Sequence, residues 1–503
     1  MAIAQDTPAP DTDEHASLDK GRLGTIGIVF FVVAAAAPLV GMTGAVPVAI
    51  VLGNGAAAPG AYLMVGITLL LFSVGYAAMS QRVTNAGAFF AYIGRGLGRH
   101  AGIASAFVSI LAYVAVQLAI FGFFGAVMAG QVGMLPWWTW SLIAWALVTV
   151  LSLLRVDVGA KVLGGLMLLE LAALVFTSIV ILANGGPEGV NFWASFNPAA
   201  IVAGGLAGSA GIAFAFAFAS FIGFEATAIY GEESREPKKV VPRATYLAVI
   251  VITVLFALTA FAMVTGMGAS HVVDKTAELS TVAKVPLAAP AEVLFSLATK
   301  YVGPWMATVM SILVLSSLFA GLLAFQNAAS RYLFAMGRGG VLPNRLGTVN
   351  GRGAPATASV VTSIITGLVL IVFAVFRLDP VLTLFYWFSG LSVVAIVLIE
   401  ILVCIAIIVY FRRNKGDENV FQTIIAPILA TIGLVLGEYL LMSRFGLLAG
   451  TVADGVDPTV TAWGLSPIGW VLVILPFALL GAGYLVSRAR TSVNAELLRD
   501  VLS

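Results

Sequence analysis

The sequence predicts an all-α integral membrane protein with about twelve transmembrane helices. Of its 503 residues, 60% are hydrophobic and only 10% are charged, whereas about a quarter of the residues in a soluble domain are charged. Apolar runs of roughly 20 residues, long enough to cross the ~30 Å hydrocarbon layer as a helix, recur along almost the whole chain. Most basic residues fall in every second loop between those runs. Together these observations predict a multi-pass membrane fold.

The expected spans leave only short connections between them. The longest connections are residues 185–200, which contain Pro and Asn, and residues 268–302. Neither has room for a second folded domain, so we expect one membrane domain. The expected spans are residues 23–51, 60–79, 102–131, 138–154, 160–184, 203–230, 243–267, 303–335, 355–376, 380–410, 421–442 and 465–487.

The loop charges predict the orientation of these spans. If the N-terminus is cytoplasmic, the outer loops contain only five of the 26 Lys and Arg residues. The positive-inside rule therefore favours cytoplasmic N- and C-termini. The first twenty residues are acidic, contain Pro and lack an apolar core, so we expect a disordered cytoplasmic tail rather than a signal peptide. The Ala- and Gly-rich composition fits a bacterial inner membrane. The outer basic residues are Lys275, Lys284, Lys300, Arg377 and Arg444.

Several classes of function are excluded by what the sequence contains. Cys404, the single cysteine, lies in an apolar run, so no disulfide or cysteine metal cluster is expected. The three histidines, His15, His100 and His271, have no metal-ligand spacing. The catalytic motifs HExxH and GxSxG and a phosphate-binding loop are absent from the sequence. We therefore expect no enzyme, no cofactor and no metal, and the scattered basic residues predict no nucleic-acid partner.

Two spans carry signals of a broken helix. The first span contains APLVGMTGAVP, in which Pro38, Gly41, Gly44 and Pro47 all disfavour a regular helix. The sixth span ends in SFIGFE, where Gly223 stands between bulky residues. The two spans are five apart, which is the spacing of inverted-repeat transporters whose unwound backbone forms a midplane site. Close helix packing is the alternative explanation for the glycines.

Several stretches resemble the amino acid/polyamine/organocation (APC) superfamily of permeases. They are PLVGMTGAVPVAIVLGNGAAAPGAYL at the first span, MSQRVTNAGAFFAYIGRGLG after the second, FASFIGFEATAIYGEESREPKKVVPRA at residues 218–244, and FQNAASRYLFAMGRGGVLP at residues 325–343. In the third stretch, the resemblance includes the acidic pair Glu232 and Glu233. The four matches lie in order along most of the chain.

The resemblance implies a fold of the leucine-transporter type that alternates between outward-open and inward-open states. This fold has two inverted repeats of five helices, here residues 22–410, followed by two additional helices, here residues 411–487. Residues 1–21 and 488–503 are then cytoplasmic tails. In the family, the broken helices bind the carboxylate and ammonium groups of the solute. Carried over to this chain, these positions are Gly41, Met42, Thr43, Gly44, Phe221, Ile222 and Gly223, although G-M-T-G departs from the tighter glycine element of many relatives.

Carboxyl groups inside the membrane are candidates for function because an ionised group there costs several kcal/mol unless it is paired. Glu170 lies about ten residues into the fifth span without a basic residue within two turns. Several proton-coupled relatives carry a lysine at a similar point, so we expect Glu170 to couple protons or bind the solute ammonium. Its alternative role is a protonated hydrogen-bond donor between helices. Glu225 is expected to hold the break in the sixth span, and Glu400 and Glu438 to serve packing.

Polar residues in two other spans complete the candidate site. Ser316 and Ser317 lie near the middle of the eighth span, where sodium-coupled members of the fold place hydroxyl ligands, but a membrane serine usually bonds its own helix. Tyr113 and Gln117, one turn apart in the third span, either face the solute or pack in the core. The coupling ion is therefore expected to be a proton, with sodium as the less favoured alternative.

The predicted function is secondary active transport of an amino acid. A polyamine or other organic amine stays open, because Glu170, Phe221 and Phe224 offer an acid and aromatic faces for extra ammonium groups. A transporter of the major facilitator type would carry acidic residues between the second and third spans, and residues 79–98 contain none. A nutrient sensor with the same fold also stays open. The expected partners are thus a small solute, a coupling ion and the lipid bilayer.

Overall fold

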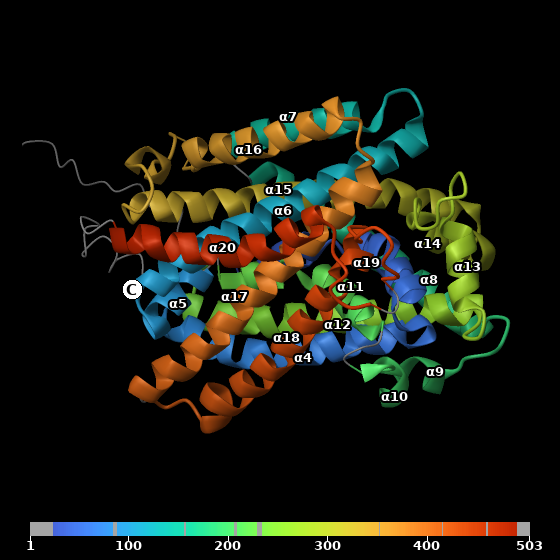
Figure 1. The fold of residues 1–503 in the computed structure, drawn as a ribbon, viewed down its shortest axis with the longest axis horizontal. Helices are drawn as coiled ribbons and strands as arrows, with labels where there is room; N and C mark the ends of the chain where they lie inside the picture. Colours follow the sequence, from blue (N-terminus) through green and yellow to red (C-terminus); the bar gives the residue numbers. More distant parts are fainter. Residues whose placement is uncertain are drawn as a thin grey trace, which may run out of the picture.

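A computed structural model describes residues 24–83, 88–154, 157–205, 209–228, 234–351, 353–414, 416–458 and 461–489. Within these ranges the regular secondary structure is helical, apart from two isolated β-bridges. Long helices run side by side along one axis (Figure 1). In this part of the chain, ten helical segments are long and apolar enough to cross a membrane. The all-helical prediction is therefore confirmed.

The expected count of twelve spans stays a prediction. The first two expected spans form one helical run, Thr25–Arg82, of 58 residues, and the fourth expected span, Trp137–Leu153, is a shorter apolar helix. The first run begins with segments that differ in helical geometry. They are α1 (Thr25–Ala36), α2 (Pro38–Val40), a π-type segment (Gly41–Ala45), α3 (Val46–Val48), a second π-type segment (Ala49–Asn54) and a 3₁₀ turn (Gly55–Ala57).

Proline and glycine mark several ends of the long helices. Pro237, Pro304 and Pro467 are first helical residues, where the missing amide hydrogen of proline costs no hydrogen bond. Gly133 and Gly268 follow helix ends with positive φ. The helices in the middle of the chain are α4 (Ala58–Arg82), α5 (Ala88–Leu97), α6 (Arg99–Val132), α7 (Trp137–Leu153), α8 (Asp157–Asn184), α9 (Phe192–Phe196), α10 (Pro198–Ile201), α11 (Ala210–Phe221), a 3₁₀ segment (Phe224–Ala228) and α12 (Pro237–Met267).

The last third of the chain continues the same pattern of long helices with short helices between them. Its elements are α13 (Val272–Ser280), α14 (Ala291–Tyr301), α15 (Pro304–Arg338), a 3₁₀ turn (Asn344–Gly347), α16 (Ala356–Val375), a π-type segment (Pro380–Phe385), α17 (Tyr386–Arg413), a second π-type segment (Phe421–Ile425), α18 (Ala426–Ser443), α19 (Phe445–Ala449) and α20 (Pro467–Ala489).

The long helices pack in two groups. In the first group, α4 packs on α12 and α11, and α1 also packs on α12. In the second group, α6 packs on α15 and α7, while α16 packs on α7 and α15; α7 and α16 lie along one edge of the molecule in Figure 1. Contacts of α1 and α2 with α15 join the first span to the second group, and α2 also contacts α8, which packs on both α12 and α15. The broken first span therefore lies where the two groups meet.

Apolar side chains face outward from several long helices. Ile312 in α15 is 61% exposed, Leu368 in α16 is 60% exposed and Leu485 in α20 is 67% exposed. Soluble monomers rarely expose large continuous apolar surfaces. This exposure is the pattern expected of helices that contact lipid.

Some expected boundaries differ from the structure. The sixth span was expected from residue 203, but α11 begins at Ala210, because Gly204 and Gly205 adopt positive φ in a turn. The long connection at residues 268–302 contains α13 and α14, which have only 9 and 11 residues and are therefore too short to be found in a search for spans. The expected tail at residues 1–21, the acidic pair Glu232 and Glu233, and residues 490–503 lie outside the described residues.

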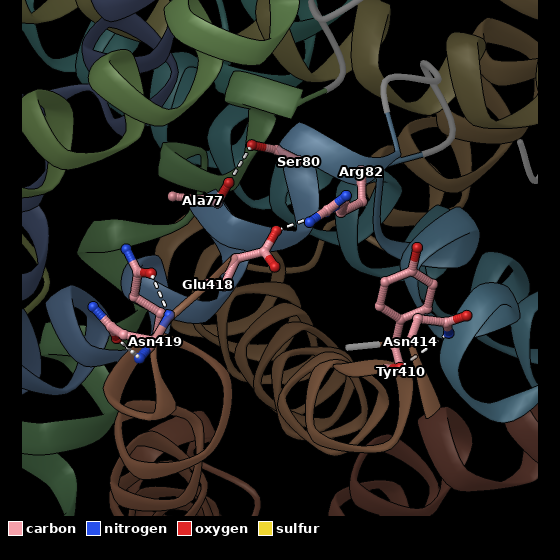
Figure 2. Close-up of polar contacts among 8 residues, drawn as sticks. Ala77, Ser80, Arg82, Tyr410, Asn414, Glu418 and Asn419 are labelled. Atoms are coloured by element: carbon pink, nitrogen blue, oxygen red, sulfur yellow. Dashed lines mark hydrogen bonds and ion pairs between the residues drawn. The ribbon is translucent and has the colours of Figure 1, made fainter. Parts of the chain in front are cut away.

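One ion pair fastens the end of α4 to the loop before α18. The Arg82 Nε atom lies 2.6 Å from Oε1 of Glu418 (Figure 2). Next to Glu418, the backbone amide of Gln422 donates to the side-chain oxygen of Asn419. At the end of α17, the Asn414 side chain donates to the Tyr410 carbonyl. The Glu418 side chain is only 11% exposed, whereas that of Arg82 is 42% exposed. The contact therefore ties the first helix group to the helices that follow residue 410.

Candidate functional site

The break in the first span lies at Ala37, which adopts a left-handed conformation with φ 43° and ψ 68°. Proline disfavours the right-handed helical conformation in the residue before it, so Pro38 explains why Ala37 leaves the helix. The amides of Val40 and Gly41 donate to the Ala37 carbonyl, and Pro38 has no amide hydrogen. The Leu39 amide is therefore left for another partner.

Glu170 binds that amide. The Leu39 amide donates to Oε1 of Glu170 at 2.6 Å, and the Ser317 hydroxyl donates to the same oxygen at 3.0 Å. The carboxyl comes from α8, the hydroxyl from α15 and the amide from the start of α2. Glu170 is only 2% exposed. One buried carboxyl thus joins three spans at the break of the first.

The break in the sixth span lies between α11 and the following 3₁₀ segment. α11 ends at Phe221, Ile222 is extended and Gly223 has φ 116°. The Gly223 amide donates to Oε2 of Glu225 at 2.8 Å, and the Tyr113 hydroxyl donates to Oε1 at 3.1 Å. The Tyr76 hydroxyl donates to the backbone carbonyl of Glu225 at 2.7 Å. Glu225 therefore satisfies backbone that the break has freed.

The two breaks touch each other. A Cβ atom at Gly223 would lie 2.8 Å from Cβ of Ala35 and 3.1 Å from the Ala36 amide nitrogen, so the end of α1 lies against the end of α11. Helix C-termini carry partial negative charge and attract cations. The amides that follow each break are bound by Glu170 and Glu225. The arrangement therefore favours a positive group beside the two helix ends.

The expected unwinding at Gly41 to Gly44 needs correction. These residues, with Ala45, form a widened π-type helical turn, and all are buried. The Thr43 hydroxyl donates back to the Leu39 carbonyl at 2.7 Å, and Met42 is fully buried. Glycine permits a break but does not impose one, whereas Pro38 disfavours the helical conformation in the residue before it. The break accordingly lies at the first residue of the expected stretch.

The remaining predicted residues divide between the breaks and the surrounding core. Phe221 stacks edge-on against Phe256 of α12, and Phe224 stacks edge-on against Phe72 of α4. The Ser316 hydroxyl donates to the Leu313 carbonyl of its own helix, unlike that of Ser317. Ile222, also buried, lies in the break itself. The structure thus brings Ser317, but not Ser316, to Glu170.

Gln117 takes part in a polar chain across the second helix group. Its Nε2 donates to Oε1 of Gln326 at 2.8 Å, and Gln326 in turn donates to Oγ of Ser363 at 3.0 Å. The Thr149 hydroxyl donates to the same Ser363 at 2.9 Å. Sequence reasoning did not single out Gln326, although it lies in the quoted stretch FQNAASRYLF. A buried amide in an apolar span was the signal that would have found it.

The residues that the structure describes contain no cluster of side chains suited to a metal ion. Within the described ranges, His, Cys, Asp and Glu form no group of three able to hold a metal ion. Glu400 and Glu438 are buried in α17 and α18. Both carboxyl oxygens of Glu438 lack a hydrogen-bond partner among the described residues.

The sequence of this chain matches the model of a known protein family. The family model described as amino acid permease matches residues 27–485, which include both breaks and the residues that bind them. The chain belongs to the amino acid permease family. This family consists of transporters rather than enzymes, and the permease is therefore a multi-pass membrane protein. The family resemblance expected from the sequence is confirmed.

Three curated proteins illustrate how the permease relates to its family. A branched-chain amino acid permease of Lactococcus lactis subsp. cremoris is 32% identical over 139 residues, 28% of this chain and 27% of that protein. An L-lysine transport protein of Corynebacterium glutamicum is 24% identical over 156 residues, 30% of this chain and 28% of that protein. An amino-acid permease of Candida albicans is 26% identical over 320 residues, 61% of this chain and 49% of that protein. The permease thus matches between about a quarter and a half of each relative's length.

Proposed function

We propose that the permease moves an amino acid across the cytoplasmic membrane by alternating access, driven by a proton that binds Glu170. The family and the names of the relatives support an amino acid as the solute. The observation that carries proton coupling is the hydrogen bond from the Leu39 amide to Glu170 at the break of the first span. Glu170 is a titratable group at a place where three spans meet.

Protonation changes what Glu170 holds together. An ionised carboxylate accepts stronger hydrogen bonds than a neutral carboxyl group. Neutral Glu170 therefore holds the Leu39 amide and the Ser317 hydroxyl less tightly, and the amide becomes available to the solute carboxylate. The solute ammonium lies beside the ends of α1 and α11, where both helix dipoles favour it. Proton binding thereby assists solute binding and frees the first span to move.

The same proposal includes the membrane topology. Two inverted repeats of five spans, residues 22–410, are followed by two additional spans, residues 411–487, and both termini lie in the cytoplasm. The placement of basic residues supports this orientation. Counting Thr25–Arg82 as two passes and Trp137–Leu153 as one supports twelve spans.

The test is uptake by purified permease in liposomes with an imposed pH gradient, with sodium replaced by choline. A panel of labelled amino acids and polyamines serves as substrates. We expect uptake of an amino acid that follows the proton gradient without sodium. Glu170→Gln is expected to abolish the response to the gradient, whereas Glu438→Gln, which changes a buried acid that has no hydrogen bond to either break among the described residues, keeps it. Unchanged pH dependence in Glu170→Gln contradicts proton coupling at this residue, and strict sodium dependence contradicts proton coupling altogether.

An organic amine such as a polyamine is the second candidate solute. It is favoured by one observation: the first amide after each break is already bound by a glutamate, while the adjoining helix C-termini suit a cation. A solute without a carboxylate needs no free amide. Polyamine uptake with no amino acid uptake in the same assay would decide for this candidate.

A further inference from the structure

The neighbours of Gln326 fix which way the nitrogen and the oxygen of its side-chain amide point. Its Nε2 lies 2.9 Å from the Ser359 carbonyl oxygen and 3.0 Å from the Ser363 hydroxyl. A backbone carbonyl can only accept, so the amide nitrogen must face α16. The side-chain oxygen of Gln326 must then face Gln117 on α6.

This fixed oxygen determines the orientation of Gln117. The Gln117 Nε2 donates to Oε1 of Gln326 at 2.8 Å and to the Leu322 carbonyl at 3.3 Å. Both partner atoms are acceptors, so a flipped Gln117 amide would place its oxygen against the Gln326 oxygen and the Leu322 carbonyl oxygen. Its Oε1 consequently faces away from both. That oxygen is buried and has no donor among the residues that the structure describes.

Gln117 lies at the depth of both helix breaks. It follows Tyr113 by one turn of α6, and the Tyr113 hydroxyl binds Glu225 at the second break. Its partner Leu322 follows Gly321, where a Cβ atom would lie 3.9 Å from Cβ of Ala37 at the first break. Gln117 is therefore one helical turn from a residue that binds the second break, and its partner Leu322 adjoins a residue near the first.

We propose that Oε1 of Gln117 forms a subsite in which it accepts a hydrogen bond from a donor group of the solute. Gln326 is the positioning residue, because it fixes the orientation of the Gln117 side-chain amide. A buried acceptor without a partner is unfavourable, so a ligand that supplies an N–H or O–H group is preferred over one that supplies only oxygen acceptors. The donor is either the solute ammonium or a group on its side chain. This inference rests on the proposed function and adds the chemical selectivity of its site.

The experiment measures apparent affinities from ligand-induced thermal stabilisation of the purified full chain, which requires no transport. For the ammonium, the probes are leucine, 3-methylbutylamine and 4-methylpentanoic acid. For a side-chain donor, the probes are threonine and valine, which differ by a hydroxyl and a methyl group. We expect the wild type to prefer the donor-bearing member of at least one pair by about tenfold.

Variants then separate positioning from folding. Gln117→Leu and Gln326→Leu are each expected to reduce that preference by about five- to tenfold, and the double variant to reduce it no further, because both act through one oxygen. Gln131→Leu is the matched control: Gln131 also lies on α6 and donates to a carbonyl of α15, that of Ser311, at 3.0 Å, but it is exposed. It should keep the wild-type preference.

Each outcome decides between the inference and the proposed function. Unchanged preference in both single variants, or losses that add in the double variant, would overturn the inference. Stabilisation of the wild type by 3-methylbutylamine but not by leucine rejects the amino acid as solute; the inference is then judged from the preference for the amine over the carboxylic acid. If no probe stabilises the wild type, both proposals fail.

Discussion

Two glutamates show how a single side chain can satisfy an interrupted helix. Backbone amides inside a membrane have no water to bind, so a break is tolerated only where another group accepts their hydrogen bonds. Glu170 reaches its amide across 131 positions in the sequence, whereas Glu225 binds the Gly223 amide two residues before it. The local contact was foreseeable from SFIGFE. The distant one depended on how the spans pack.

Gly223 carries two separate constraints. Its φ of 116° is strained for any residue with a Cβ atom, and that atom would also lie 2.8 Å from Cβ of Ala35. We expect Gly223→Ala to lower the free energy of unfolding by about 1–3 kcal/mol or more. The measurement is thermal unfolding of the purified protein.

Gly189→Ala is the matched control for this prediction. Gly189 has φ 79° but nothing within 4 Å of the added atom, so its variant carries strain without a steric clash. We expect Gly189→Ala to lose less stability than Gly223→Ala. Equal losses would mean that contact between α1 and α11 does not constrain the site.

At the scale of elements, the first span shows why glycine content does not locate a break. Gly41 and Gly44 stay helical, and the left-handed residue is an alanine. Pro38 favours the break, since its ring disfavours the right-handed helical conformation in the preceding residue. Pro47 lies within α3 without such a break, so proline alone did not identify the position either. The bond from Leu39 to Glu170 is what satisfies the amide left by the break at Ala37.

The ion pair between α4 and the loop before α18 predicts a pH dependence of stability. Its hydrogen bond with Arg82 holds the pKa of Glu418 below its ordinary value. A carboxyl with a lowered pKa stabilises the folded state above its unfolded pKa, and this contribution is lost as pH falls through the folded pKa. We expect Glu418→Gln to be less stable than the wild type at pH 7, and the difference to shrink below about pH 4.

The measurement is the unfolding temperature of both proteins between pH 3 and pH 8. Because the Arg82 side chain is 42% exposed, the difference should be small and should decrease with added salt. The control is Glu236→Gln: Glu236 pairs with Lys239, but both side chains are largely exposed. A difference for Glu418→Gln that is independent of pH would show that the ion pair is not its source.

At the scale of the whole molecule, two helix groups meet around the breaks. The group of α1, α4, α11 and α12 contains both interrupted spans, and the group of α6, α7, α15 and α16 is joined internally by the chain from Gln117 to Thr149. Glu170 and Tyr113 connect the broken spans to helices outside their group. Movement of the broken spans relative to these helices would therefore change both contacts.

The orientation of the protein in the membrane can be tested by labelling cysteines introduced at its surface. Cys404 is the only cysteine and is buried, so a new surface cysteine gives a clean signal. We expect Thr299→Cys in α14 to react with a membrane-impermeant thiol reagent in intact cells. Asn414→Cys, beside the basic residues Arg412 and Arg413, should react only in inside-out vesicles. The reverse pattern would place the termini outside and contradict the positive-inside argument.

The sequence by itself predicted the all-helical fold and singled out the two glutamates that bind the broken spans. Runs of apolar residues predicted the long helices, because the length of a span follows from the thickness of the bilayer. The same reasoning identified Glu170 and Glu225, since a carboxyl in an apolar run is costly and stands out. It missed α13 and α14, because helices of 9 and 11 residues are too short to cross the bilayer.

Only the tertiary structure decided what these residues bind. Leu39, an apolar residue without a side-chain signal, contributes its backbone amide to Glu170, and Gln326 fixes the direction in which the Gln117 amide points. Such contacts depend on the relative depth and rotation of spans that lie far apart in the sequence. The hydrophobic pattern of a span fixes its length but leaves depth and rotation to the packing of neighbouring helices.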